Sequence, residues 1–271
     1  MAKGIGDDMR QIGVVTKYEI LKHLRSKRML IFIAIAVILF ALMTALVIIL
    51  DGKLPDDPTE FMKQYLAIVI IMIIIGTSLI CAPAIASEFE ERTALLMFPR
   101  PMKKTSFFIG KVLACYIVCG AVIVLYYLIC IVLSFICTGG LDLNTFGSLG
   151  MALLFMMGAG GFGLLMSSMF KKGSTSIIVT ILVLLLVFYS MIDGLLIMFE
   201  VEPFFSLTYA GLDILNFVAG DPTGIQIIET PMGPVEMMFY YPSHALAVSV
   251  MATWAIVTTA LAALLFRRRE F

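Results

Sequence analysis

The sequence predicts an all-α integral membrane protein with six transmembrane helices. Three observations predict this class. Hydrophobic residues make up 61% of the 271 residues and charged residues only 14%, against about 25% charged in an ordinary soluble domain. The mean hydropathy is +1.04, and too few polar residues remain to coat a soluble core. Six apolar runs are each long enough to cross a bilayer as a helix, which takes about 20 residues.

The six runs are consistent with one membrane domain. They are expected at about 30–50, 65–86, 112–137, 147–170, 176–199 and 245–266. Each run must be helical, because backbone polar groups in hydrocarbon have to be satisfied within the segment. The expected organisation is therefore an N-terminal segment, 1–29, followed by a six-span transmembrane domain, 30–271.

Basic residues predict the orientation. Seven of the 19 Lys and Arg residues precede the first span, five lie between spans two and three, two join spans four and five, and three follow span six. Only Lys53 and Lys63 lie on the other side. Because cytoplasmic connections carry the excess of Lys and Arg, both termini are expected in the cytoplasm. The protein is expected in the plasma or inner membrane of the cell.

The N-terminal segment contains a basic amphipathic stretch. Val14, Tyr18 and Leu21 recur at helical spacing, with Leu24 on the same side. The wetter side carries the basic residues Lys17, Lys22, Arg25 and Arg28. This pattern predicts a helix in the membrane interface. The alternative is a cytoplasmic extension of span one.

The connection between spans two and three predicts a charged helix that projects into the cytoplasm. Its first half is acidic, with Glu88 four residues before Arg92, a favourable order for a helical ion pair. Pro99 and Pro101 end that helix. It also carries exposed apolar residues such as Leu95 and Phe98, which indicate a contact with another protein.

The outer side has a long connection, 200–244, with five prolines and only acidic charges. Its piece 207–219 is apolar enough for a re-entrant or interfacial helix. Asp193 is the one acidic residue well within an apolar run. Charge inside a membrane usually faces a cavity or a partner, so Asp193 is a candidate for a transport path. A residue that reaches the outer interface is the equal alternative.

Motifs for catalysis are missing from the sequence. It contains no phosphate-binding loop and neither a zinc-protease nor a serine-hydrolase motif. His23 and His244 lie on opposite sides of the predicted membrane. Cys115 and Cys119 could share a helix face, but a copper site there would have no nearby histidine. We therefore expect no catalytic residues, no metal ligands and no enzyme activity, and the zero net charge does not favour nucleic acid.

Four sequence features together resemble the membrane-spanning permease subunits of type-two ABC transporters, mostly exporters. The first is the basic amphipathic stretch before span one. The second is SEFEERTALLMFPRP at 87–101, with TSFFIGKVL at 105–113 behind it. The others are GLLMSSMFKK at 163–172 and the FRRREF terminus at 266–271. They cover the whole chain. One departure is Thr93, where the family often has Gly after Glu-Arg.

The resemblance implies a function as the permease subunit of an ABC exporter. Two such subunits, either two copies or two homologous permeases, would pair in the lipid bilayer, and separate ABC ATPase subunits would bind ATP and Mg²⁺. The acidic inner helix would be the coupling helix that contacts the ATPase. The residues expected at that contact are Glu88, Glu90, Glu91, Arg92, Leu95, Phe98 and Arg100. A stand-alone six-helix transporter or channel is the alternative.

Overall fold

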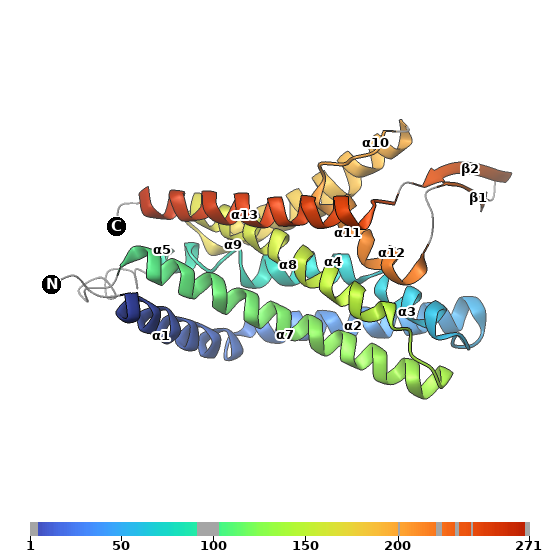
Figure 1. The fold of residues 1–271 in the computed structure, drawn as a ribbon, viewed down its shortest axis with the longest axis horizontal. Coiled ribbons are helices and arrows are strands. Elements are labelled where there is room, and N and C mark those ends of the chain that lie inside the picture. The colour runs from blue at the N-terminus through green and yellow to red at the C-terminus, as the bar shows by residue number, and fades with distance from the viewer. Residues whose placement is uncertain are drawn as a thin grey trace.

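The computed structural model describes residues 5–90, 103–199, 201–220, 224–230, 233–239 and 241–268. Six helical segments in this part are long and apolar enough to cross a membrane, which confirms the predicted class. They are Lys27–Leu50, Pro58–Ile80, Lys104–Thr138, Asn144–Met169, Gly173–Met198 and His244–Arg268. Figure 1 shows them side by side along the long axis, with both termini at one end. We call this end the basic end and the other, which the distribution of basic residues predicts to face outside, the outer end.

The elements follow one another along the chain with short connections. The first half comprises α1 (Ile5–Leu24), α2 (Lys27–Asp51), α3 (Pro58–Leu66), α4 (Val69–Ile80), α5 (Ala86–Glu90) and α7 (Lys104–Thr138). The second half comprises α8 (Asn144–Met169), α9 (Gly173–Ile181), the π-helix η1 (Leu182–Ile192), α10 (Asp193–Met198), α11 (Leu207–Gly211), α12 (Asp213–Ala219), β1 (Gly224–Thr230), β2 (Gly233–Phe239) and α13 (His244–Arg268).

Local sequence explains where span two begins and ends. Asp57 accepts hydrogen bonds from the backbone N–H groups of Thr59 and Glu60, and Pro58 occupies the first turn, where its missing N–H costs nothing. At the other end, α4 stops at Ile80, and a turn that contains Pro83 separates it from α5. Span two therefore runs from residue 58 to 80, earlier than the predicted 65–86.

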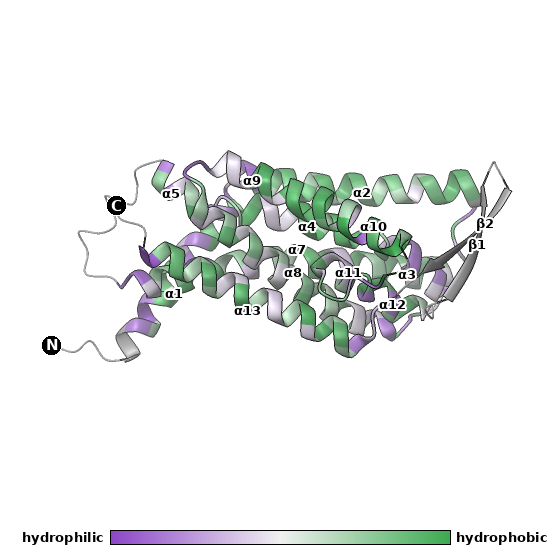
Figure 2. Ribbon diagram, turned by 90° about the horizontal axis from the view of Figure 1, so that it is seen from above, coloured by the Kyte–Doolittle hydropathy of each residue, from purple (hydrophilic) through white to green (hydrophobic). Residues whose placement is uncertain are grey.

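Helix α8 lies at the centre of the bundle and packs against α4, α7, α12 and α13. Its glycine-rich run, 158–163, allows this close packing, since small residues let helices approach in lipid. Phe155 and Ala159 of α8 are completely buried. Figure 2 shows that hydrophobic residues dominate the long helices, whereas hydrophilic residues gather toward the basic end and near α3 and α12.

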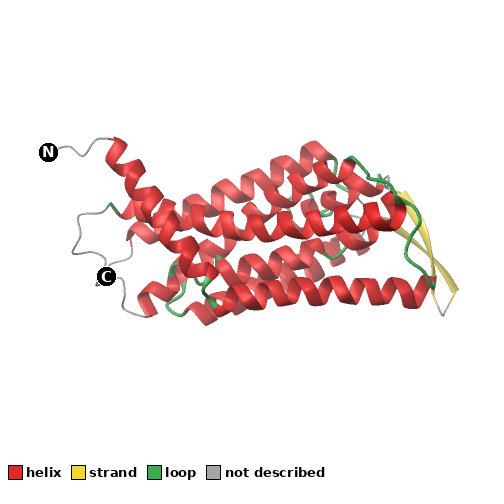
Figure 3. Cartoon of the chain, turned by 90° about the horizontal axis from the view of Figure 1, so that it is seen from below, coloured by secondary structure: helices red, strands yellow, loops and turns green. Residues whose placement is uncertain are grey.

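The outer end is closed by the segment between spans five and six. Helices α11 and α12 pack against α8, α13 and α3, and the side chains of Leu207 and Tyr209 are fully buried. A two-stranded antiparallel hairpin, β1 and β2, follows them and projects beyond the outer end (Figure 3). The apolar helical piece 207–219 was predicted from the sequence, whereas the hairpin was not.

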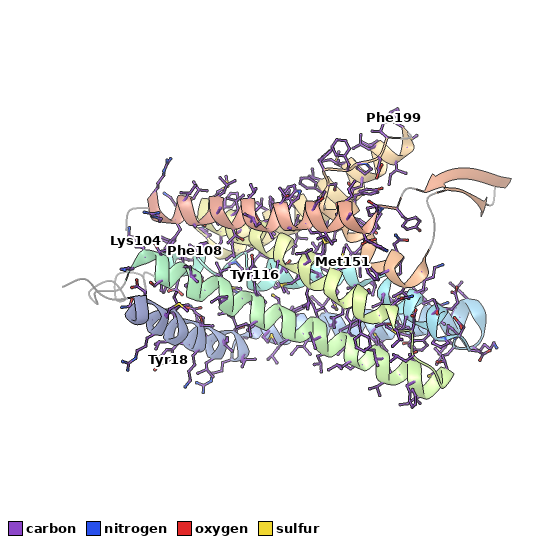
Figure 4. The ribbon with its side chains drawn as sticks, viewed as in Figure 1. Tyr18, Lys104, Phe108, Tyr116, Met151 and Phe199 are labelled. Carbon is purple, nitrogen blue, oxygen red and sulfur yellow. The ribbon has the colours of Figure 1, made fainter. Side chains whose placement is uncertain are left out.

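Helix α1 is a separate helix and not a continuation of span one. It ends at Leu24, and Ser26 caps the start of α2 by accepting a hydrogen bond from Met29 N–H. The predicted apolar side is exposed, and Tyr18, 68% exposed, points away from the bundle in Figure 4. The opposite side, with Val15, packs along α7. Placement of α1 in the membrane interface stays a prediction.

Candidate functional site

The candidate site is a cluster of charged side chains, three of them buried, at the basic end, where α1, α5 and α7 meet. The Lys111 ammonium of α7 donates to Glu19 Oε1 of α1 at 2.8 Å and to Glu88 Oε1 of α5 at 3.0 Å. Lys111 is only 1% exposed, and the two glutamates are 6% and 3% exposed. Lys22 of α1 adds a second donor to Glu88 Oε1, at 2.6 Å. We call these four residues the charge cluster.

The charge cluster forms because α1 lies very close to the first turns of α7. Gly110 of α7 makes this approach feasible, since a Cβ placed there would lie 2.7 Å from Val15 Cβ. Thr16 donates a hydrogen bond to the Gly110 carbonyl at 3.3 Å. Lys103 and Asp8 form an ion pair at the start of the same interface. The two helices are therefore held together along most of α1.

Helix α5 is also tied to spans four and five. The Ser167 hydroxyl of α8 accepts hydrogen bonds from the backbone N–H groups of Ile85 and Ala86, at 2.9 and 3.0 Å. These are start-of-helix donors that have no partner within α5 itself. At its other end, Glu90 Oε2 accepts from the Gly173 N–H at 2.9 Å, at the first turn of α9. This carboxylate is favourably placed at the positive end of the α9 dipole.

These contacts attach α5 to its neighbours on both sides. A short helix with neutralised charge and satisfied backbone donors is attached to α1 and α7 on one side and to α8 and α9 on the other. Removing one partner of a buried ion pair costs about 3–5 kcal/mol. Movement of α5 away from α1, or away from the transmembrane helix α7, would therefore be costly.

The predicted site residues divide between two environments. Glu88 and Glu90 lie on α5, within the described part of the chain. Glu88 faces the bundle, whereas Glu90 is exposed at the surface. The remaining predicted contact residues lie outside the described residues: Glu91, Arg92, Leu95, Phe98 and Arg100. The residues that hold α5 and its charge cluster in place were not predicted from the sequence. They are Glu19, Lys22, Lys111, Ser167 and Gly173.

A histidine does lie beside one of the membrane cysteines, contrary to expectation. His23 Nε2 of α1 is 3.7 Å from Cys115 Sγ of α7, and both side chains are buried. The prediction that no histidine approaches Cys115 was wrong because it treated α1 and α7 as separate. Across the described ranges, however, no group of three or more His, Cys, Asp or Glu side chains is placed to hold a metal ion.

The sequence matches the family described as "ABC-2 family transporter protein" over residues 51–266, which is most of the chain. The chain belongs to the ABC-2 transporter family. A similar protein is the "Uncharacterized membrane protein YdbK" of Bacillus subtilis (strain 168). It is 25% identical over 186 residues, which cover 66% of this chain and 73% of that protein.

Membership of the ABC-2 family establishes the general role of the chain. It is a multi-pass membrane permease of an ABC transporter, a transport component that is not itself catalytic. Helix α5 carries Glu88 and Glu90, two of the residues predicted at the ATPase contact. The charge cluster joins α5 to α1 and to the transmembrane helix α7.

Proposed function

We propose that this ABC-2 permease forms the membrane path of an exporter that is driven by a separate ATPase subunit docked at the basic end. ATP and Mg²⁺ bind the ATPase, and its closure pushes on the segment that begins at α5. The observation that carries the proposal is the attachment of α5 to α1, α7, α8 and α9 through Glu88, Ser167 and Glu90. These four attachments would carry a displacement of α5 to the helices around it.

The proposal assigns different tasks to the predicted contact residues. Glu88 anchors α5 to Lys111, because its carboxylate is buried against the permease itself. Glu90, Glu91, Arg92, Leu95, Phe98 and Arg100 contact the ATPase. Apolar residues in an otherwise charged projecting segment supply a surface for such a contact.

Orientation and assembly are parts of the same proposal. The basic end faces the cytoplasm, since 17 of the 19 Lys and Arg residues belong in sequence to the two termini and the two connections predicted to be cytoplasmic. Family membership supports pairing with a second permease, either another copy or a homologue. The path between the two permeases opens toward the outside when the ATPases close.

Purification from the native membrane in mild detergent tests the proposed function. We expect mass spectrometry to identify a soluble protein with a phosphate-binding loop in the purified complex. A second permease in the same sample would identify a heterodimer. Recovery of this chain without an ATPase in several detergents would contradict the proposal and favour a stand-alone transporter or channel.

A further inference from the structure

Asp193 is a buried carboxyl group at the junction where span five leaves the bundle. It begins α10, directly after η1, and α10 extends away from the bundle to Phe199 (Figure 4). The Asp193 side chain is 5% exposed. The Thr208 hydroxyl of α11 is 2.5 Å from Asp193 Oδ2. The Ser206 hydroxyl continues this chain of hydrogen bonds, 2.9 Å from Thr208 Oγ1.

Among the described residues, none supplies a compensating positive charge to Asp193. Within the described part of the chain, no lysine, arginine or histidine forms an ion pair with it, and Oδ1 has no hydrogen-bond partner. Of the elements packed against η1 and α10, α4 and α9 contain no titratable residue. The titratable residues of η1 and α11 are Tyr189 and Tyr209. The Tyr209 hydroxyl donates a hydrogen bond to Glu202 Oε1 at 2.9 Å.

Burial and the nearby charges determine whether the Asp193 carboxyl group is ionised or protonated. An ionised carboxylate without a partner in a low-dielectric interior is so costly that the group takes up a proton instead. A divalent metal ion is a poor alternative, because Ca²⁺ and Mg²⁺ need six or more oxygen ligands. The side chains here offer one carboxyl group and two hydroxyl groups. A neutral carboxylic acid is compatible with this environment.

We propose that Asp193 is a proton-binding site, neutral at physiological pH, which fastens α11 to span five. The neutral acid and the two hydroxyl groups form one hydrogen-bonded chain between η1 and the segment that closes the outer end. Loss of the proton leaves a charge that must reach water, so α11 has to move away from span five. Acidic conditions therefore favour the closed arrangement, and rising pH weakens it.

Infrared spectroscopy of the purified chain in lipid vesicles tests this proposal independently of any ATPase. At pH 7 we expect a carboxylic acid C=O band that Asp193→Asn abolishes. Asp56→Asn serves as the matched control, because Asp56 is an exposed aspartate paired with Lys53. This control should leave the band unchanged.

A second variant keeps the test informative if Asp193→Asn fails to fold. Asp193→Glu retains a carboxyl group and should shift the band without abolishing it. A carboxylic acid spectrum at pH 7 that neither Asp193 variant alters would overturn the proposal, since Asp193 would then be ionised.

Discussion

Replacement of Lys111 by methionine is expected to lower the free energy of unfolding by about 3–5 kcal/mol, the usual cost of removing one partner from a buried ion pair. Glu19 and Glu88 would remain buried without the Lys111 ammonium, and Lys22 would still pair with Glu88. We expect α1 and α5 to loosen from α7. Thermal unfolding of the purified protein in detergent measures the loss.

Two further variants separate stability from coupling. Lys17→Met is the matched control, since Lys17 is exposed on α1, and it should unfold as the wild type does. A triple variant that combines Lys111→Met with Glu19→Gln and Glu88→Gln removes the buried charges together. It should recover much of the stability, because apolar or neutral replacements of whole buried ion pairs are often tolerated. Transport should stay impaired in the triple variant if the charge cluster transmits movement. Wild-type unfolding of Lys111→Met would contradict the account.

Substitution of Gly161 by alanine is expected to destabilise the bundle by about 1–3 kcal/mol through overpacking. A Cβ at Gly161 would lie 2.4 Å from Thr258 Oγ1 and 3.3 Å from the Ala255 carbonyl oxygen of α13. Thr258 is 4% exposed and donates to the Trp254 carbonyl at 2.6 Å, so it has little freedom to move. The helices α8 and α13 must therefore separate.

Gly150, also on α8, provides a control, because alanine at this position is not expected to lower the stability. No atom lies within 4 Å of a Cβ placed there, and alanine is favoured over glycine in a helix by up to about 1 kcal/mol. Gly150→Ala should leave stability unchanged or raise it slightly. Equal unfolding temperatures for the two alanine variants would show that α8 and α13 are not packed as described.

Much of the fold could be predicted from the sequence because hydrocarbon imposes strong constraints. Six helical runs followed from hydropathy alone, and the structure contains six helical segments of this kind. The bounds of span two were less accurate, since the cap at Asp57 and the turn at Pro83 shift it toward the N-terminus. Such shifts depend on a few polar atoms that hydropathy does not measure.

The arrangement of the charge cluster could not be predicted in this way. Glu88 lies 66 residues from Lys22 and 23 from Lys111, and a helical pattern reports only on neighbours three or four residues apart. The family resemblance placed Glu88 at the ATPase contact, whereas the structure buries it against α1 and α7. The proximity of His23 to Cys115 escaped prediction for the same reason.

Site-directed photo-crosslinking from Leu95 in intact membranes tests the central claim most directly. A photoreactive residue at this position should capture a soluble protein with a phosphate-binding loop, because Leu95 belongs to the segment proposed to contact the ATPase. The same residue at Ile256, which is 69% exposed on α13, serves as the control and should not capture it. A Leu95 adduct with an ATPase would support both the docking site and the cytoplasmic placement of the basic end. Capture of the ATPase from Ile256 but not from Leu95 would contradict the account.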